Sequence, residues 1–210
     1  MASSDKPQGQ ASDAAEAHLV ERTVSSKQAY LGHFLDVRAD KIALPDGGEA
    51  SREYIVHPGA VVIVPMLDDG RLVLERQYRY PLQQVLLEFP AGKLDPGESR
   101  AVAAMRELAE ETGYRAAEWA CAGVLHNAAA YSNEFIEIWF ARGLTPGERQ
   151  LDHGELIDLC LMQESELDAL AARGELTDAK TLICLLWLQK WRSGQWTLDW
   201  QAAAQLGNCP

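Results

Sequence analysis

The chain contains 210 residues, of which 47% are hydrophobic, and it carries a formal net charge of −12 at pH 7. This length can bury one large core, or a compact domain with an added subdomain. Because the balance is acidic and no basic stripe occurs, the composition excludes binding to nucleic-acid phosphates. No signal peptide is evident, and no apolar run is long enough to span a bilayer, so no membrane partner is expected.

The cysteines and histidines do not form a metal-binding pattern. The four cysteines are scattered, without metal or redox spacing, at Cys121, Cys160, Cys184 and Cys209. We therefore expect free thiols in a reducing, cytoplasmic environment. The five histidines show no pairing suited to zinc, and we expect them to be structural or exposed.

In chain order, the sequence begins with a polar segment and a small β subdomain. Residues 1–17 are rich in Ser, Ala, Gln and Asp, which predicts a disordered tail. Residues 18–57 alternate apolar and polar side chains around 30–37, and a turn at 45–48 precedes a second strand at 53–57. A two-stranded antiparallel block is marginal by itself, which favours a homodimer.

The remainder of the chain predicts one larger domain over residues 58–200, with a tail at 201–210. Residues 59–65 are a near-continuous β-branched run, typical of a buried strand. The other expected elements are strands at 71–78, 119–125, 134–141 and 156–162, and helices at 100–112, 164–173 and 178–192. Strands, a helix, more strands and closing helices indicate a mixed α/β (α+β) sandwich.

The most distinctive segment covers residues 92–114. It fits the spacing G-x5-E-x7-R-E-U-x-E-E-x-G-U, in which U is a bulky apolar residue. The seven fixed positions are Gly92, Glu98, Arg106, Glu107, Glu110, Glu111 and Gly113. We expect Ser99 to cap the N-terminus of the helix and Gly113 to end it.

This helix combines an acidic face with an apolar face. At about 100° per residue, Glu107, Glu110 and Glu111 fall within an arc of roughly 100°. The side chains expected to pack into the core centre on roughly the opposite face: Val102, Met105, Leu108 and Ala109, with Ala101 and Thr112 nearby. The carboxylates repel one another, and a divalent cation removes that cost. Oxygen ligands favour Mg²⁺ or Mn²⁺ over Zn²⁺, whereas the alternative is an ordinary solvated acidic face. Arg106 and Glu98 are expected to orient the carboxylates.

The spacing of residues 92–114 resembles the Nudix box, the signature of hydrolases that cut a nucleoside diphosphate linked to another moiety. Over roughly residues 28–192 the chain also resembles the ADP-ribose pyrophosphatase branch of that family, whose members are also called ADP-sugar pyrophosphatases. The segments that carry the resemblance are Arg52-Glu53, ERQYRYP (75–81), LEFPAGK (87–93), GELID (154–158) and TDAKT (177–181). The resemblance implies the Nudix fold, a mixed β-sheet sandwiched between helices.

The resemblance also implies a reaction. It is the Mg²⁺-dependent hydrolysis of the pyrophosphate bond of ADP-ribose, or a related nucleoside diphosphate sugar, giving AMP and a sugar phosphate. The metal ligands would be Glu107, Glu110, Glu111 and the main-chain carbonyl of Ala91. Glu155, in a Gly-containing loop, would position or deprotonate the attacking water, and Glu111 and Arg106 would support catalysis with it.

Further positions match substrate-site residues of the resembling branch. Arg79 would contact a phosphate or the terminal ribose, since a guanidinium fork suits phosphate oxygens. Arg52, Glu53 and Glu88 are additional candidates. In this branch the amino-terminal sheet commonly exchanges with a partner subunit and completes the adenosine site, which again implies a homodimer.

The chain departs from the branch after the box. Alanines occupy residues 128–130, within HNAAAYSNE (126–134), where a proline and a glycine are expected. GDP-mannose or another sugar nucleotide therefore remains an alternative substrate, and Tyr131 is a candidate to stack on a base or sugar. A non-catalytic Nudix-like nucleotide sensor is the alternative from a different class.

Overall fold

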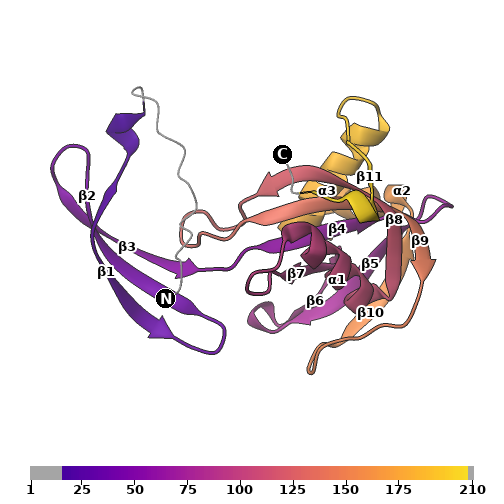
Figure 1. The fold of residues 1–210 in the computed structure, drawn as a ribbon, viewed down its shortest axis with the longest axis horizontal. Helices are drawn as coiled ribbons and strands as arrows, with labels where there is room; N and C mark the ends of the chain where they lie inside the picture. Colours follow the sequence, from indigo (N-terminus) through magenta and orange to yellow (C-terminus); the bar gives the residue numbers. More distant parts are fainter. Residues whose placement is uncertain (1–15, 208–210) are drawn as a thin grey trace. The chain divides into compact units, whose positions relative to one another are not determined.

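The computed structural model describes residues 16–207 and divides the chain into two compact units. The first contains the chain up to His57 together with Ala130–Asn133, and the second contains Pro58–Ala129 and the chain from Glu134 onward. The two units are shown in Figure 1 and are described separately below. Nearly all of the predicted tail at 1–17 lies outside the described residues.

The first unit is an antiparallel sheet with the strand order β1-β2-β3. Its elements are η1 (Ala17–Leu19), β1 (Arg22–Leu31), β2 (Asp36–Ala43) and β3 (Glu49–Val56). The prediction of only two strands in this block is wrong. All ten residues of β1 are exposed, and its sequence lacks the apolar alternation of a half-buried strand. The sequence pattern therefore did not indicate this strand.

The second unit is built around two sheets. A five-stranded sheet has the order β11-β8-β9-β4-β7, in which β4 and β9 are parallel and the other pairs antiparallel. Its strands are β4 (Ala60–Pro65), β7 (Ala91–Lys93), β8 (Tyr114–Leu125), β9 (Ile136–Pro146) and β11 (Gln201–Ala202). A three-stranded antiparallel sheet contains β10 (Ile157–Met162), β5 (Leu72–Arg79) and β6 (Gln84–Glu88). The short helix η2 (Tyr80–Leu82) joins β5 to β6.

Helices cover both faces of the five-stranded sheet (Figure 1). They are α1 (Arg100–Thr112), α2 (Glu164–Ala172) and α3 (Ala179–Arg192), followed by the short η3 (Ala203–Gln205). Val61 and Ile63 of β4 pack in the same core as Leu108 of α1. Val62 and Val64 point the other way, into the core that contains residues of α2, α3 and β5. This confirms the predicted mixed sheet between helices and the N-terminal antiparallel sheet.

The cysteines depart in part from the expectation of free thiols. Cys160 and Cys184 are free, as expected. Cys121 is instead disulfide-bonded, and Cys209 lies outside the described residues. No helix in the described part of the chain is long and apolar enough to cross a membrane.

Candidate active site

Helix α1 carries most of the candidate site, and it begins and ends at the predicted residues. The Ser99 hydroxyl accepts a hydrogen bond from the backbone N–H of Val102 at 3.3 Å, which caps the N-terminus. Gly113 ends the helix with a φ of 76°, in the left-handed region that favours glycine. A Cβ at Gly113 would also lie 2.6 Å from the carbonyl oxygen of Gly147. Glycine at this position therefore lets the loop after β9 approach the end of the helix closely.

The predicted packing face of α1 is correct in part, because Leu108 is buried and Met105 packs against the same core, but Val102 is not buried. The buried residues are Ala101, Ala103, Ala104, Glu107, Leu108, Glu111 and Thr112, whereas Val102 is 48% exposed. The small alanine side chains let the helix approach the sheet closely, and this turns Glu107 and Glu111 inward. Val102, with Arg106 and Glu110, instead lines a pocket of about 430 Å³ on the outer side of α1.

Strand β7 lies directly against the two inward carboxylates. The backbone N–H of Ala91 donates to Oε2 of Glu111 at 3.0 Å. A Cβ at Gly92 would lie 1.9 Å from the carboxyl carbon of Glu107, so only glycine fits at this position without displacing the carboxylate. The fixed glycine of the motif is therefore explained by the approach of the backbone to Glu107.

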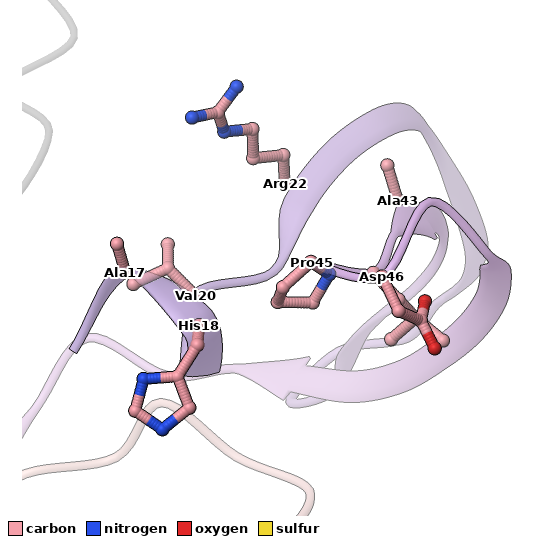
Figure 2. Close-up of a pocket in the computed structure, with 8 residues that line it drawn as sticks. Ala17, His18, Val20, Arg22, Ala43, Pro45 and Asp46 are labelled. Carbon is pink, nitrogen blue, oxygen red and sulfur yellow. The ribbon is translucent and has the colours of Figure 1, made fainter.

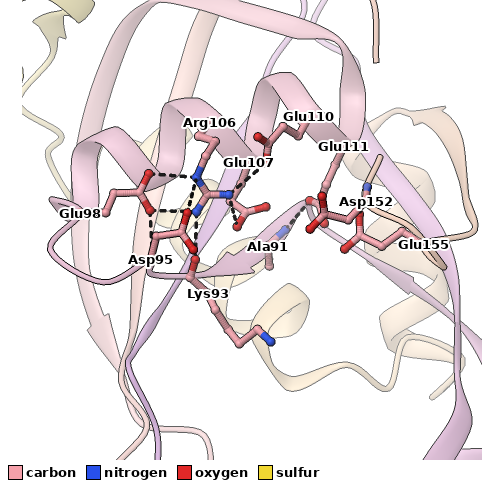
Figure 3. Close-up of polar contacts among 10 residues, drawn as sticks. All are labelled: Ala91, Lys93, Asp95, Glu98, Arg106, Glu107, Glu110, Glu111, Asp152 and Glu155. Carbon is pink, nitrogen blue, oxygen red and sulfur yellow. Dashed lines mark hydrogen bonds and ion pairs between the residues drawn. The ribbon is translucent and has the colours of Figure 1, made fainter. Parts of the chain in front are cut away.

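Arg106 is the centre of a carboxylate network, drawn in Figure 3. Its Nε and Nη2 donate to the two oxygens of Glu98 at 2.9 and 2.8 Å. Its Nη1 donates to Oε1 of Glu107 at 2.8 Å and to Oε2 of Glu110 at 3.0 Å. Nη2 also donates to the carbonyl of Lys93 at 3.0 Å. The guanidinium thus contacts three carboxylates at once, and its role in orienting them for catalysis stays a prediction.

Burial and mutual repulsion disfavour ionisation of the inward carboxylates. Burial raises the pKa of Glu107 to about 7, although Arg106 opposes the rise. Burial also raises the pKa of Glu111 far above its usual range, and repulsion from Glu75 and Glu107 adds to the effect. A nearby cation would favour the ionised forms of both Glu107 and Glu111.

Within the described residues, no three His, Cys, Asp or Glu side chains are placed to enclose a metal ion. Arg106 gives a physical reason at α1, because its N–H groups draw oxygens of Glu107 and Glu110 toward the guanidinium. Side-chain rotation is needed before these oxygens can share one ion. The predicted metal ligands Ala91, Glu107, Glu110 and Glu111 therefore stay a prediction.

The loop between β9 and β10 brings Glu155 near the helix carboxylates (Figure 3). The Glu155 carboxylate accepts from the backbone N–H of Asp152 at 3.1 Å, and it is among the charges that raise the pKa of Glu107 and Glu111. Arg149 anchors this loop: its Nε donates to the carbonyl of Glu111 at 2.7 Å and its Nη2 to the carbonyl of Ile157 at 2.9 Å. Arg149 was not among the predicted residues.

Comparison with known protein families identifies the family to which the chain belongs. Residues 56–183 match the family described as NUDIX domain. The chain belongs to the Nudix family. Residues 21–55 match a second family, described as nucleoside diphosphate sugar hydrolase N-terminal domain.

Relatives cover most of this Nudix chain. The ADP-ribose pyrophosphatase of Bacillus subtilis (strain 168) is 32% identical, with 81% of this chain and 94% of the relative covered. The methanol dehydrogenase activator of Bacillus methanolicus is 33% identical, with 80% and 92% covered. A crystal structure of an ADP compounds hydrolase has a TM-score of 0.75 at 26% identity, covering 83% of this chain and 95% of that chain. The predicted fold and enzyme class, a Nudix hydrolase, are confirmed.

Two of the predicted substrate residues, Arg79 and Glu88, belong to a partly buried ion-pair network in the Nudix unit. Arg79 donates from Nε and Nη2 to the two oxygens of Glu88, each at 2.7 Å. Lys180 donates to the same carboxylate at 2.9 Å and to Asp178 at 2.8 Å. Burial raises the pKa of Glu88, but Arg79 and Lys180 outweigh it, so the pKa lies below its usual value. The network joins β5 and β6 to the N-terminus of α3.

The other predicted substrate residues belong to the first unit. Arg52 forms an ion pair with Glu21, in which its Nε donates to Oε2 at 2.9 Å and its Nη2 donates to Oε1. Glu53 is an exposed residue of β3, and Tyr131 is 59% exposed. The backbone carbonyl of Tyr131 accepts from the N–H of Ile55 at 2.9 Å, which ties this segment to β3. The roles of Arg52, Glu53 and Tyr131 stay predictions.

A pocket of about 650 Å³ also lies in the first unit (Figure 2). Its lining includes His18 and Arg22 near the start of the sheet and Asp46 in the turn after β2. None of its lining residues is a predicted site residue, and none belongs to the Nudix box. The residues that line this pocket therefore give no reason to assign it a part in the chemistry proposed for α1.

Glu75 is a buried carboxylate that the sequence analysis did not single out. It follows Leu72, Val73 and Leu74 in β5, and all four residues are fully buried. The available signal was a glutamate in an otherwise apolar strand segment. After burial, repulsion from Glu75 is the next cause of the raised pKa of Glu111 in the Nudix helix.

Proposed function

We propose that this Nudix hydrolase cleaves the pyrophosphate bond of ADP-ribose or a related nucleoside diphosphate sugar, giving AMP and a sugar phosphate. The observation that carries the proposal is the group of inward carboxylates, Glu107 and Glu111, beside the loop carboxylate Glu155. The names of the Bacillus subtilis relative and of the superposed ADP compounds hydrolase support this substrate class.

Nudix hydrolases generally use a divalent metal, and we assign Mg²⁺ here, with Mn²⁺ as a substitute. The ligand atoms present are hard oxygens. In the described part of the chain the buried carboxylate oxygens of Glu75 have no hydrogen-bond partner, which fits a cation in this region. Glu107, Glu110, Glu111 and the carbonyl of Ala91 would hold it. When bound, the cation polarises the phosphoryl group and lowers the pKa of a bound water.

The remaining site residues bind and orient. Arg106 would keep Glu107 and Glu110 correctly directed, and Glu155 would position or deprotonate the attacking water. Arg79 would contact a phosphate or the terminal ribose through the N–H groups that do not bond Glu88. We assign Arg52, Glu53 and Tyr131 to contacts with the substrate as well.

We further propose that the enzyme is a homodimer; the disulfide at Cys121 removes the free-thiol argument for a cytoplasmic location. In the first unit β1 is exposed along its whole length, with Val24, Tyr30 and Leu31 each more than half exposed. A three-stranded sheet with such an edge gains stability when a second copy covers it. A homodimer that exchanges these sheets would supply Arg52 and Glu53 to the partner's site.

Two alternatives keep specific support. The alanines at 128–130 leave GDP-mannose or another sugar nucleotide as a substrate. The Bacillus methanolicus relative is named an activator of another enzyme, which favours testing a nucleotide-sensing role. The buried carboxylates of α1 favour catalysis over sensing alone, since a sensor has no need to bear their repulsion.

A substrate panel separates these functions. The purified chain is incubated with Mg²⁺ and ADP-ribose, ADP-glucose, GDP-mannose, NADH or a diadenosine polyphosphate, and the products are separated by chromatography. We expect AMP and a sugar phosphate from ADP-ribose at the highest kcat/KM. Preferred cleavage of GDP-mannose would replace the substrate assignment. Binding of these nucleotides without cleavage of any would support the sensor.

A further inference from the structure

Glu75 is an acidic side chain to which the described residues offer no hydrogen bond. It lies in the middle of β5 with no exposed surface, and neither of its carboxylate oxygens has a hydrogen-bond partner within residues 16–207. Buried polar groups are almost always paired, because an unpaired one loses its hydration without replacement. An unpaired buried carboxylate therefore indicates a partner that binds carboxylate oxygen.

The neighbouring buried carboxylate, Glu88, has the hydrogen-bond donors that Glu75 lacks. Glu88 lies directly across from Glu75 in the β5–β6 ladder and is equally buried. It accepts hydrogen bonds from both Arg79 and Lys180. These cations are thus engaged by Glu88, and Glu75 is left without a direct bond to either.

Glu75 faces the carboxylates of the Nudix helix and its loop. Its ladder partner Glu88 is three residues before Ala91, whose backbone N–H donates to Glu111, so sheet pairing brings Glu75 close to the α1 carboxylates. Burial raises the pKa of Glu75 to about 8, and repulsion from Glu88 and, least, from Glu155 adds to the rise. The carboxylates of Glu75, Glu111 and Glu155 come from β5, α1 and the loop before β10, so no ordinary helix pairing explains their approach. A shared divalent cation would satisfy all of them at once.

We propose that Glu75 is an additional carboxylate ligand for divalent cations bound at the α1 carboxylates. It binds from β5, directly or through a metal-bound water, and adds to the ligands on α1 and β7. The inference rests on the proposed metal-dependent function and deepens it. It accounts for the placement of an acidic residue within an apolar strand.

Manganese binding tests this role without reference to turnover. The signal of free Mn²⁺ in electron paramagnetic resonance is titrated with wild-type protein and with the Glu75→Gln and Glu75→Leu variants. Gln is nearly isosteric with the acid and Leu suits a buried position, so far-UV circular dichroism should confirm the fold of at least one. We expect Mn²⁺ affinity to fall by about tenfold or more, or the number of bound ions to fall by one.

Two controls make the result specific. Glu137→Gln changes another fully buried carboxylate, which is paired with Arg100 and Trp139 instead, and should leave Mn²⁺ binding unchanged. Glu111→Gln should weaken binding if the proposed α1 site is correct. Unchanged affinity and stoichiometry in folded Glu75 variants, with binding lost in Glu111→Gln, would overturn the role of Glu75 alone. Wild-type binding in all variants would overturn the α1 metal site itself.

Discussion

At the scale of single residues, the site depends on how closely the β7 backbone approaches two buried carboxylates. Glu111 accepts from the N–H of Ala91, and Glu107 occupies the space where a side chain at Gly92 would lie. The motif glycine therefore does more than permit a turn. It sets the distance between the backbone carbonyls of β7 and the carboxylates of α1.

The substitution Gly92→Ala should displace Glu107. Because its Cβ would lie 1.9 Å from the Glu107 carboxyl carbon, the carboxylate must rotate or β7 must shift. We expect kcat to fall by about tenfold to 100-fold, since small misplacements of catalytic groups have such effects. Steady-state kinetics at saturating Mg²⁺ measure this change.

Gly97→Ala is the matched control for Gly92→Ala. Gly97 has a φ of 81°, so alanine there is strained, but nothing lies within 4 Å of the added Cβ. It should lower the unfolding temperature while leaving kcat near the wild-type value. Equal losses of kcat in the two variants would show that the effect is general strain.

The raised pKa of Glu107 predicts how stability depends on pH. The folded-state pKa is about 7, against an ordinary 4.5, so the folded protein retains a proton that the unfolded chain releases. This contribution is fully present below about pH 4.5 and is lost as the pH rises through about 7, amounting to about 3 kcal/mol. In EDTA, the unfolding temperature of the wild type should fall over this window, and Glu107→Gln should make the profile flatter. Parallel profiles for the two proteins would contradict the assignment.

At the scale of elements, the loop that carries Glu155 is fixed to α1 and β10 by Arg149. One guanidinium bonds the carbonyls of Glu111 and Ile157, and so fixes both the start and the end of the loop. Arg149→Ala should lower kcat by about tenfold to 100-fold with little change in KM. It should also speed amide hydrogen exchange in residues 147–156. Arg149→Lys should not rescue kcat, because a single ammonium cannot reproduce the fork.

The control for Arg149 is Arg71→Ala, which removes an exposed pair with Asp69. Such pairs contribute little, so kcat and loop exchange should match those of the wild type. If Arg149→Ala also leaves loop exchange unchanged, the anchoring role is wrong.

Local signals predicted α1 well, but its packing could not be predicted from them. Ser99 and Gly113 define the ends because caps are local chemistry. The buried face was predicted only in part, because the pattern gave weight to Val102, which is exposed, and none to Ala103 and Ala104, which are buried. Close packing against alanine is a tertiary effect, and it is what buries the carboxylates. The position of Glu75 relative to Glu111 likewise follows from sheet pairing and is not visible in the sequence.

At the scale of the whole molecule, the exposed sheet of the first unit predicts self-association. Light scattering coupled to gel filtration should give twice the chain mass of 23.2 kDa. The double variant Val24→Asp and Leu31→Asp places charges on exposed apolar positions of β1 and should give a single-chain mass. Leu186→Asp, at an exposed position of α3, should leave the dimer intact. A wild-type protein that elutes at the single-chain mass would contradict the homodimer.

The central claim is that the buried carboxylates of α1 support metal-dependent hydrolysis of a nucleoside diphosphate sugar. It is tested most directly by the rate of AMP formation from ADP-ribose and Mg²⁺, compared between wild type and Glu111→Gln. Gln keeps the shape of Glu111, which is 4% exposed, but removes its charge. We predict that the wild type forms AMP and that the folded variant has no measurable turnover. Near wild-type turnover in Glu111→Gln would contradict the claim.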